Sequence, residues 1–451
     1  MQKNLTNGNI TKSLFLFAIP MILGNLLQQT YNIADTLIVG RFIGTHALAA
    51  VGSSFSLMTF LTSIFLGLCM GSGTVFSIRF GQGETEKMRE DVFVSFVLIA
   101  GITLTLNIVV FLLLDPILHL LQIPGEVYAM MKDYLMVIFW GIPAVFLYNY
   151  FASLLRALGN SAVPLVFLGI SVVLNISFDL LFVIGFQWGI KGAAAATVLS
   201  QYVSGVGIGI FAMIKYPYIW PNRAHMRVRK GVLGEICHFS LLTCVQQSVM
   251  NLGILMVQGI VNSFGTAVMA AFAAAVKIDS FAYMPVQDFG NAFSTFIAQN
   301  HGAGKTERIR LGVKSAVLTA MGFSAAVSVV VFLFTEPLMM IFVSAKETKI
   351  LQIGVQYLRI EGSFYFGIGL LFLLYGYYRA VEKPGMSVVL TGVSLGLRVL
   401  LAYVLSSNPA LGVIGIWVSV PIGWILADLT GAVYYFYLKK KESGCGRIRQ
   451  S

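Results

Sequence analysis

The chain is short of charge, cysteine and histidine. Only 11% of its 451 residues are Asp, Glu, Lys or Arg, and it has four cysteines and five histidines. The cysteines are too scattered for a metal-ligand spacing, and no grouping of nucleophile, histidine and acid is found. No segment between the apolar runs is long enough for a nucleotide-binding domain. We therefore expect neither an enzyme nor a transporter driven directly by ATP.

Apolar sequence is what the chain has in excess. Hydrophobic residues make up 57% of it, and its mean hydropathy is +0.83. A run of about 20 apolar residues is long enough to cross a bilayer as a helix. The chain is therefore predicted to be an all-α polytopic membrane protein with twelve transmembrane helices, near residues 13–40, 47–78, 92–114, 128–152, 162–184, 190–214, 232–263, 266–299, 312–334, 351–378, 385–406 and 411–438.

The basic residues indicate how the chain is oriented. There are 30 Lys and Arg against 19 Asp and Glu, a net charge of +11. With both termini in the cytoplasm, 22 of the basic residues fall in cytoplasmic segments and five on the other side. This is the positive-inside pattern. We expect a multi-pass protein of the plasma (cell inner) membrane with both ends cytoplasmic, and a net charge that reflects topology rather than a nucleic-acid partner.

The sequence repeats itself once. "GTHALAA" from Gly44 matches "GTAVMAA" from Gly265, and "GQGETEKMR" from Gly81 matches "GAGKTERIR" from Gly302, each 221 residues apart. Further matches in the same order complete two six-helix halves. The predicted division is a first lobe (1–214), a basic cytoplasmic linker (215–231), a second lobe (232–440) and a cytoplasmic tail (441–451).

The even number of helices in each half constrains the architecture. Both copies must insert in the same orientation, which gives parallel repeats related by an axis along the membrane normal. Two such six-helix bundles predict a central cavity that opens to alternate sides of the membrane. A passive channel or a duplicated scaffold is the alternative, and it predicts no dependence on an ion gradient.

Polar residues inside the first half suggest an ion site. Asp35 ends a polar stripe on the first helix that also holds Gln28 and Asn32, while Asn175 and Asp179 share a face of the fifth. Thr197, on the sixth helix, could add a hydroxyl. These oxygens suit a small cation such as Na⁺, or a pair of acids that binds a proton. The alternative is that Asn175 and Asp179 only hydrogen-bond to neighbouring helices.

The second half lacks these groups at the corresponding positions. Asn175 aligns with Arg398, Asp179 with Ala402 and Thr197 with Val420, so the predicted cation site belongs to the first half alone. Helix 7 offers Gln247 and Asn251 but no acid. With Gln28 and Asn32, these two amides are predicted to line the substrate cavity.

Several charges of the second half also fall within the apolar runs. Each needs a partner, a cavity or a proton, because an isolated charge in a bilayer is costly. We favour buried ion pairs between helices, with substrate contact as the alternative. The residues concerned are Lys277, Asp279, Asp288, Arg359, Glu361 and Arg398.

Taken together, these features resemble the multidrug and toxic compound extrusion (MATE) family. The likeness rests on "AIPMILGNLLQQTYNIADTLIVGRFIG" in the first helix, the "GQG" and "GAG" turns, Arg156 with Ala157 and Gly159, and the duplicated twelve-helix layout. It covers nearly the whole chain. No single motif is highly specific, but their order is.

The resemblance implies a secondary antiporter that exports amphipathic, often cationic, small molecules in exchange for Na⁺ or H⁺ and needs no other cofactor. Asp35, Asn175, Asp179 and Thr197 match the family's coupling-ion residues, and Pro20 matches a proline at which the first helix bends in some members. Members with an acid on helix 7 are not matched, because Gln246 and Gln247 stand there.

Other possibilities stay open at this point. A lipid or lipid-linked oligosaccharide flippase of the same superfamily is the nearest alternative, although an Arg-rich cavity would be expected for it. The sequence separates neither Na⁺ from H⁺ nor one substrate from another. We expect a monomer embedded in the lipid bilayer that acts on a small molecule.

Overall fold

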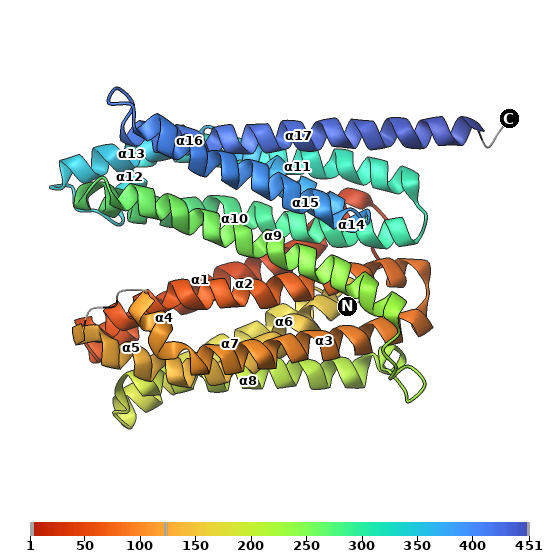
Figure 1. Cartoon of the computed structure of the whole chain (residues 1–451), viewed down its shortest axis with the longest axis horizontal. Coiled ribbons are helices and arrows are strands. Elements are labelled where there is room, and N and C mark those ends of the chain that lie inside the picture. Colours follow the sequence, from red (N-terminus) through yellow and green to blue (C-terminus); the bar gives the residue numbers. More distant parts are fainter. Residues whose placement is uncertain (1–3, 121–122, 124, 449–451) are drawn as a thin grey trace. The chain divides into compact units, whose positions relative to one another are not determined.

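The computed structural model is built from helices joined by short turns (Figure 1). It describes residues 4–120, 123 and 125–448. Residues 449–451, the end of the predicted tail, lie outside the described residues. An all-α fold is confirmed for the part of the chain that the structure describes.

The helices of the first half follow the repeat. They are α1 (Ile10–Phe42), α2 (Thr45–Gln82), α3 (Thr85–Leu112), α4 (Leu114–Leu120), α5 (Gly125–Ile138), the 3-10 turn η1 (Phe139–Gly141), α6 (Ile142–Ala157), α7 (Ala162–Asp179), the π-helical turn η2 (Leu180–Gly185), α8 (Gly189–Lys215) and the 3-10 turn η3 (Pro217–Ile219).

The second half has the matching series. Its helices are α9 (Lys230–Asn262), α10 (Thr266–Gly302), α11 (Thr306–Leu333), α12 (Thr335–Met340), α13 (Thr348–Gly362), α14 (Tyr365–Ala380), α15 (Pro384–Thr391), the π-helical turn η4 (Gly392–Gly396), α16 (Leu397–Ser406) and α17 (Val413–Ile448).

The twelve predicted spans are confirmed. Eleven helical segments of the described chain are long and apolar enough to cross a membrane, and there are twelve when α13 and α14, bent by 51° at the break between them, are counted as one span. The bend at residues 363–364 was not predicted, because it contains no proline. The short helices α4 and α12 are also additions, and they occupy matching places in the two halves.

Backbone conformation repeats along with the sequence. Gly83 ends α2 with φ of +74°, and Gly304, 221 residues later, follows α10 with φ of +66°. A side chain at either position would be strained, since this left-handed conformation favours glycine. The second glycines of the "GQG" and "GAG" turns are thus explained by the chain reversal that each turn makes.

The chain forms two compact units whose limits differ from those of the repeat. Unit 1 comprises Met1–Ser248 and Ala298–Arg308, and unit 2 comprises Val249–Ile297 and Ile309–Ser451. The predicted linker packs within unit 1, where Ile219 is fully buried. Helices α9 and α10 each begin in one unit and end in the other.

Two apolar clusters of the described residues lie in unit 1. Helix α2 packs on α3, α5 and α6, and α7 packs on α1 and α8 (Figure 1). One cluster surrounds Phe65, Met131 and Phe139, and the other surrounds Phe76 and Tyr150. Packing of α7 against both α1 and α8 brings the three helices with the predicted ion ligands together.

Unit 2 has its own core. Helix α17 packs on α13, α14 and α16, and stacked or edge-on aromatic rings of Phe272, Tyr357 and Trp417 fill one cluster. A second cluster surrounds Tyr378 and Trp424. This core includes Tyr357, whose hydroxyl contacts two buried acids of the second half, Asp279 and Glu361.

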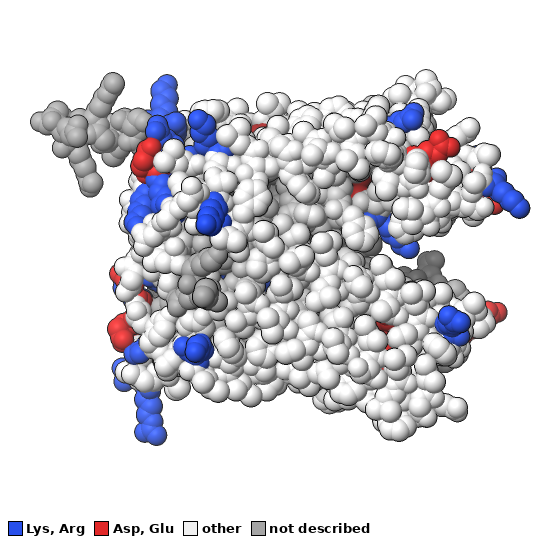
Figure 2. Space-filling model, turned by 180° about the vertical axis from the view of Figure 1, so that it is seen from behind, with Lys and Arg blue, Asp and Glu red and all other residues white. Residues whose placement is uncertain are grey.

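The outer surface suits a lipid solvent. Large apolar side chains such as Leu112, Ile214 and Val433 are at least 70% exposed. In each unit, the face shown in Figure 2 carries its blue and red charged side chains at the helix ends and is white along most of the helix length. Exposed apolar surface of this extent is costly in water but not in a bilayer.

Candidate coupling-ion site

The four predicted ion ligands come together in unit 1. Asp35 lies on α1, Asn175 and Asp179 on α7, and Thr197 on α8. Their relative exposures are 7%, 1%, 0% and 6%, respectively. A polar cluster this deeply buried needs internal hydrogen bonds, a proton or a cation to replace the water it has lost.

Hydrogen bonds join only part of this cluster. Asn175 donates through Nδ2 to Thr197 Oγ1 at 3.2 Å, and the Tyr31 hydroxyl donates to the same oxygen at 3.4 Å. The amide oxygen of Asn175 receives no hydrogen bond from the described residues. The amide and hydroxyl are therefore positioned, while an acceptor oxygen beside them stays free.

The two acids face one another. The carboxyl groups of Asp35 and Asp179 lie within electrostatic range of one another. No donor from the described residues reaches either oxygen of Asp179 or Oδ1 of Asp35. No ion pair is formed by either acid within the described chain.

These free oxygens match the chemistry of a small hard cation. Carboxylate, amide and hydroxyl oxygens are ligands for such ions, and two neighbouring carboxylates that lose their water repel one another unless a cation or a proton intervenes. Within the described residues no three His, Cys, Asp or Glu side chains form a metal-binding group. A cation here would therefore depend on Asn175 and Thr197 as well as on the acids.

The backbone also changes where the site lies. Asp179 is the last residue of α7, and the π-helical turn η2 begins at the next residue. Single π-helical turns are frequent at functional sites because they turn side chains out of the regular helical register. The side chains that follow Asp179 are therefore out of the helical register of α7.

Two tyrosines near the site were missed by the sequence analysis. Tyr31 lies one turn before Asp35 on the same face of α1, and this spacing could have identified it. Tyr134, on α5, lies within electrostatic range of Asp35, Asp179 and Tyr31. Its contribution comes from packing between distant helices, which the sequence does not display.

The other predicted site residues lie outside this group. Gln28 is exposed and Asn32 half-buried, while Gln247 is buried and its amide contacts Met70 Sδ at 3.9 Å. Asn251 is half-buried in the part of α9 that belongs to unit 2. Pro20 lies inside the continuous helix α1. Substrate contact by the four amides and bending at Pro20 stay predictions.

For Asp279 and Glu361, the expected buried ion pairs are not found among the described residues. Asp279 on α10 accepts hydrogen bonds from the hydroxyls of Tyr365 and Tyr357, the latter at 2.5 Å, and Tyr357 also lies 2.9 Å from Glu361. Within the described chain no Lys or Arg forms an ion pair with either acid. Tyrosine hydroxyls solvate these carboxyls instead.

Three basic residues that fall within the apolar runs of the second half form no ion pair with Asp279 or Glu361. They are Lys277, Arg359 and Arg398. Lys277 lies over the ring of Phe342 at 5.7 Å, and Arg359 lies over that of Phe332 at 5.8 Å. Arg398 is within electrostatic range of Asp279 and Glu361, but it makes no ion pair with them. Cation–π contacts thus replace ion pairs for Lys277 and Arg359.

A family model described as MatE matches the chain twice, over residues 20–181 and 243–404. The probable multidrug resistance protein YpnP of Bacillus subtilis is 30% identical over 436 residues, which cover 96% of both chains. The probable multidrug resistance protein NorM of Thermotoga maritima is 26% identical over 448 residues, 96% of this chain and 93% of that one.

Solved structures agree on the fold. A transporter of the MOP superfamily from Pyrococcus furiosus superposes with a TM-score of 0.89 at 23% identity and covers 96% of each chain. The two family matches also correspond to the two halves of the repeat. The chain is a multi-pass membrane transporter and belongs to the multidrug and toxic compound extrusion (MATE) family.

Proposed function

We propose that the protein is a secondary antiporter that exports amphipathic, cationic small molecules in exchange for Na⁺ or H⁺. The observation that carries this proposal is the buried pair of Asp35 and Asp179, which has no basic partner among the described residues and keeps free oxygens. The relatives' names, probable multidrug resistance proteins, support the export of small molecules, and the amphipathic, cationic class is what the family resemblance implies.

The acids give the coupling its physical basis. A cation or proton that enters from outside relieves the repulsion between Asp35 and Asp179 and draws α1 towards α7. The empty pair favours a different position of α1, so ion occupancy biases two conformations of the first half. If one of these conformations holds substrate less firmly, ion entry drives substrate release by linkage.

Topology gives the direction of transport. The positive-inside distribution of Lys and Arg supports cytoplasmic termini, and the parallel repeat supports alternating access by rocking of the two halves. The ion then moves down its gradient into the cell while the substrate leaves. The energy source is the gradient.

The test is export of a fluorescent organic cation from proteoliposomes, first under an imposed Na⁺ gradient and then under a pH gradient. Asp35→Asn should abolish gradient-driven export. Asp133→Asn is the matched control, since Asp133 is half exposed and paired with Lys191 at 3.2 Å. Wild-type export by Asp35→Asn would remove the site assignment, and failure of both gradients would favour a flippase.

A further inference from the structure

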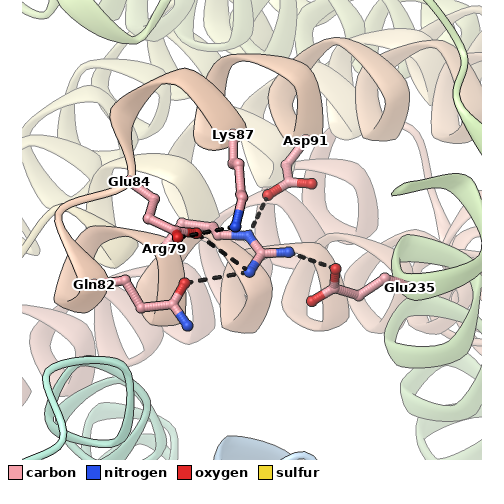
Figure 3. Close-up of polar contacts among 6 residues, drawn as sticks. All are labelled: Arg79, Gln82, Glu84, Lys87, Asp91 and Glu235. Carbon is pink, nitrogen blue, oxygen red and sulfur yellow. Dashed lines mark hydrogen bonds and ion pairs between the residues drawn. The ribbon is translucent and has the colours of Figure 1, made fainter. Parts of the chain in front are cut away.

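One end of unit 1 contains a cluster of charges that the coupling-ion site does not use. Figure 3 shows the guanidinium of Arg79, in the last turn of α2, among Gln82, Glu84, Asp91 and Glu235. It donates to Asp91 at 3.0 Å, to Glu235 at 2.5 Å and to Gln82 at 3.2 Å. By the charge distribution, this end is the cytoplasmic one.

The two strong partners of Arg79 have different roles. Asp91 belongs to α3, the other arm of the α2–α3 hairpin, and its side chain is 1% exposed. Glu235 lies near the start of α9, beyond the linker and in the second half of the repeat, and its side chain is 34% exposed. Arg79 therefore joins the two sequence repeats, and of its two strong bonds the one to Glu235 is the one that water can easily replace.

Close backbone packing accompanies this ion pair. A Cβ atom at Gly67 would lie 2.5 Å from Cys244 Cα, and one at Gly71 would lie 2.5 Å from the carbonyl oxygen of Phe239. Helices α2 and α9 thus approach without large side chains between them. Small residues at these two positions let the two helix backbones approach closely.

Helix α9 continues from unit 1 into unit 2, with the limit between Ser248 and Val249. A rocking motion of the second half must therefore either bend α9 near this limit or pull its first turns away from α2. The partly exposed Glu235 carboxylate, whose bond to Arg79 water can replace, favours the second. We propose that Arg79 is a cytoplasmic latch, whose bond to Glu235 forms in one transport conformation and breaks in the other.

The other hairpin offers a contrast. Asn300, which occupies the place of Arg79 in the second repeat, donates to the backbone carbonyl of Leu5 at 3.3 Å. Arg308 donates to the same carbonyl and to those of Asn7 and Gly8. The first hairpin thus contacts the start of α9, and the second contacts the segment that leads into α1. The Arg79 contact, in contrast, is an ion pair that ends on a partly exposed acid.

This inference rests on the proposed alternating access, and its first test is a reversible cross-link. Ser72 Oγ on α2 and Ser240 Oγ on α9 are 2.8 Å apart and fully buried, a separation that suits a disulfide. Ser72→Cys with Ser240→Cys is made in a chain whose four native cysteines are replaced. Oxidation, followed by counting free thiols, should stop export, and a reductant should restore it.

A second cross-link serves as the control. Gly73→Cys with Ser153→Cys joins α2 to α6 within the first half, where a Cβ atom at Gly73 would lie 3.2 Å from Ser153 Cβ. Its oxidation should leave export unchanged. Full export by the oxidised Ser72→Cys/Ser240→Cys variant would overturn the latch. Absence of gradient-driven export from the wild-type chain would instead count against the proposed antiport.

The second test needs no transport. Cys244 lies at the contact between α2 and α9, and it becomes the only thiol after replacement of Cys69, Cys237 and Cys445. Glu235→Gln should raise its alkylation by a membrane-impermeant maleimide added at the cytoplasmic side about fivefold, as expected for the loss of one partly buried ion pair. We avoid Arg79 variants, because they would leave the buried Asp91 carboxylate unpaired.

The control for this test is Glu84→Gln. Glu84 also lies near Arg79, at 3.8 Å, but it belongs to the same hairpin and joins nothing to α9. Its labelling rate should equal that of the parent. Glu235→Asp, which keeps the charge, should restore slow labelling. Equal rates for Glu235→Gln and Glu84→Gln would show that Arg79 is a fixed anchor and not a latch.

Discussion

Each half of the molecule has, among its buried acids, one pair from two different helices, Asp35 with Asp179 in the first half and Asp279 with Glu361 in the second, and the surroundings of the two pairs differ. In the first half, Asp35 and Asp179 keep three carboxylate oxygens that receive no hydrogen bond from the described residues. In the second half, both oxygens of Asp279 accept a hydrogen bond from a tyrosine hydroxyl. Most carboxylate oxygens of the first-half pair thus lack a hydrogen-bond donor among the described residues, whereas tyrosine hydroxyls donate to those of Asp279.

Proton counting sharpens this difference. The Tyr357 hydroxyl has one proton but lies within hydrogen-bond distance of both Asp279 and Glu361. Both contacts can be hydrogen bonds only if one of the acids carries a proton. The second-half cluster therefore holds a proton of its own, whereas under the proposed antiport the first-half pair receives its cation or proton from outside.

The largest expected effect comes from removing the free acid pair. Asp179→Asn should lower gradient-driven export by about 100-fold, since the coupling free energy depends on ion binding there. The folded protein should not lose stability, because an amide replaces a buried carboxylate that has no donor. Export from proteoliposomes and the thermal midpoint in detergent measure the two effects.

A lower thermal midpoint for Asp179→Asn would contradict this view. It would mean that Asp179 has a structural partner and that the first-half pair resembles the second-half cluster. Leu180→Ala serves as the control for disturbance of the π-helical turn, because Leu180 follows Asp179 directly and is 45% exposed.

The next effect concerns the satisfied cluster. Asp279→Asn removes the charged acceptor of two buried hydroxyls and should destabilise the protein by roughly 1 to 3 kcal/mol. Ion dependence of export should persist in the fraction that folds. The thermal midpoint and the dependence of export on Na⁺ or pH, normalised to folded protein, separate the two properties. Loss of ion dependence with unchanged stability would reverse the roles assigned to the halves.

The sequence predicts the first-half site better than the second. Asp35, Asn175 and Asp179 stand out because they interrupt apolar runs at helical spacing, and the twelve spans follow from run length alone. The structure confirms the spans and brings these residues together with Thr197. The family resemblance, which the comparisons confirm, named the same positions.

The second-half cluster could not be predicted in this way. Tyr357 and Tyr365 are ordinary members of an aromatic-rich sequence, and nothing in their spacing shows that both hydroxyls turn towards Asp279 on another helix. Tyr357 and Tyr365 lie on either side of the 51° bend between α13 and α14, and no proline in the sequence marks this bend. Contacts between helices are set by packing, which periodicity does not encode.

A smaller effect is expected at the edge of the first-half site. Tyr31→Phe removes one weak hydrogen bond to Thr197, at 3.4 Å, and leaves the acids in place. The concentration of coupling ion for half-maximal export should rise by about twofold to fivefold. Maximal export should stay near that of the wild type. An effect as large as that of Asp179→Asn would mean that the tyrosine hydroxyl itself takes part in ion transfer.

The smallest effect is expected for an acid with a basic partner outside the membrane. Asp115 of α4 is held by Lys132 at 2.7 Å and by the Tyr128 hydroxyl, and the hydrogen bond from Lys132 is the main reason that the pKa of Asp115 lies below its ordinary value. A lowered pKa contributes stability above the ordinary value of an aspartate, and this contribution disappears as the pH falls through the folded value.

Lys132→Ala should therefore return the pKa of Asp115 towards its ordinary value, with no change in export near neutral pH, where Asp115 is ionised in both proteins. NMR titration of a ¹³C-labelled Asp115 carboxyl, with export measured at neutral pH, checks both points. A change in export would show that a solvent-exposed acid with a partner also matters for coupling. The distinction between free and satisfied carboxylates would then no longer separate functional from structural acids in this protein.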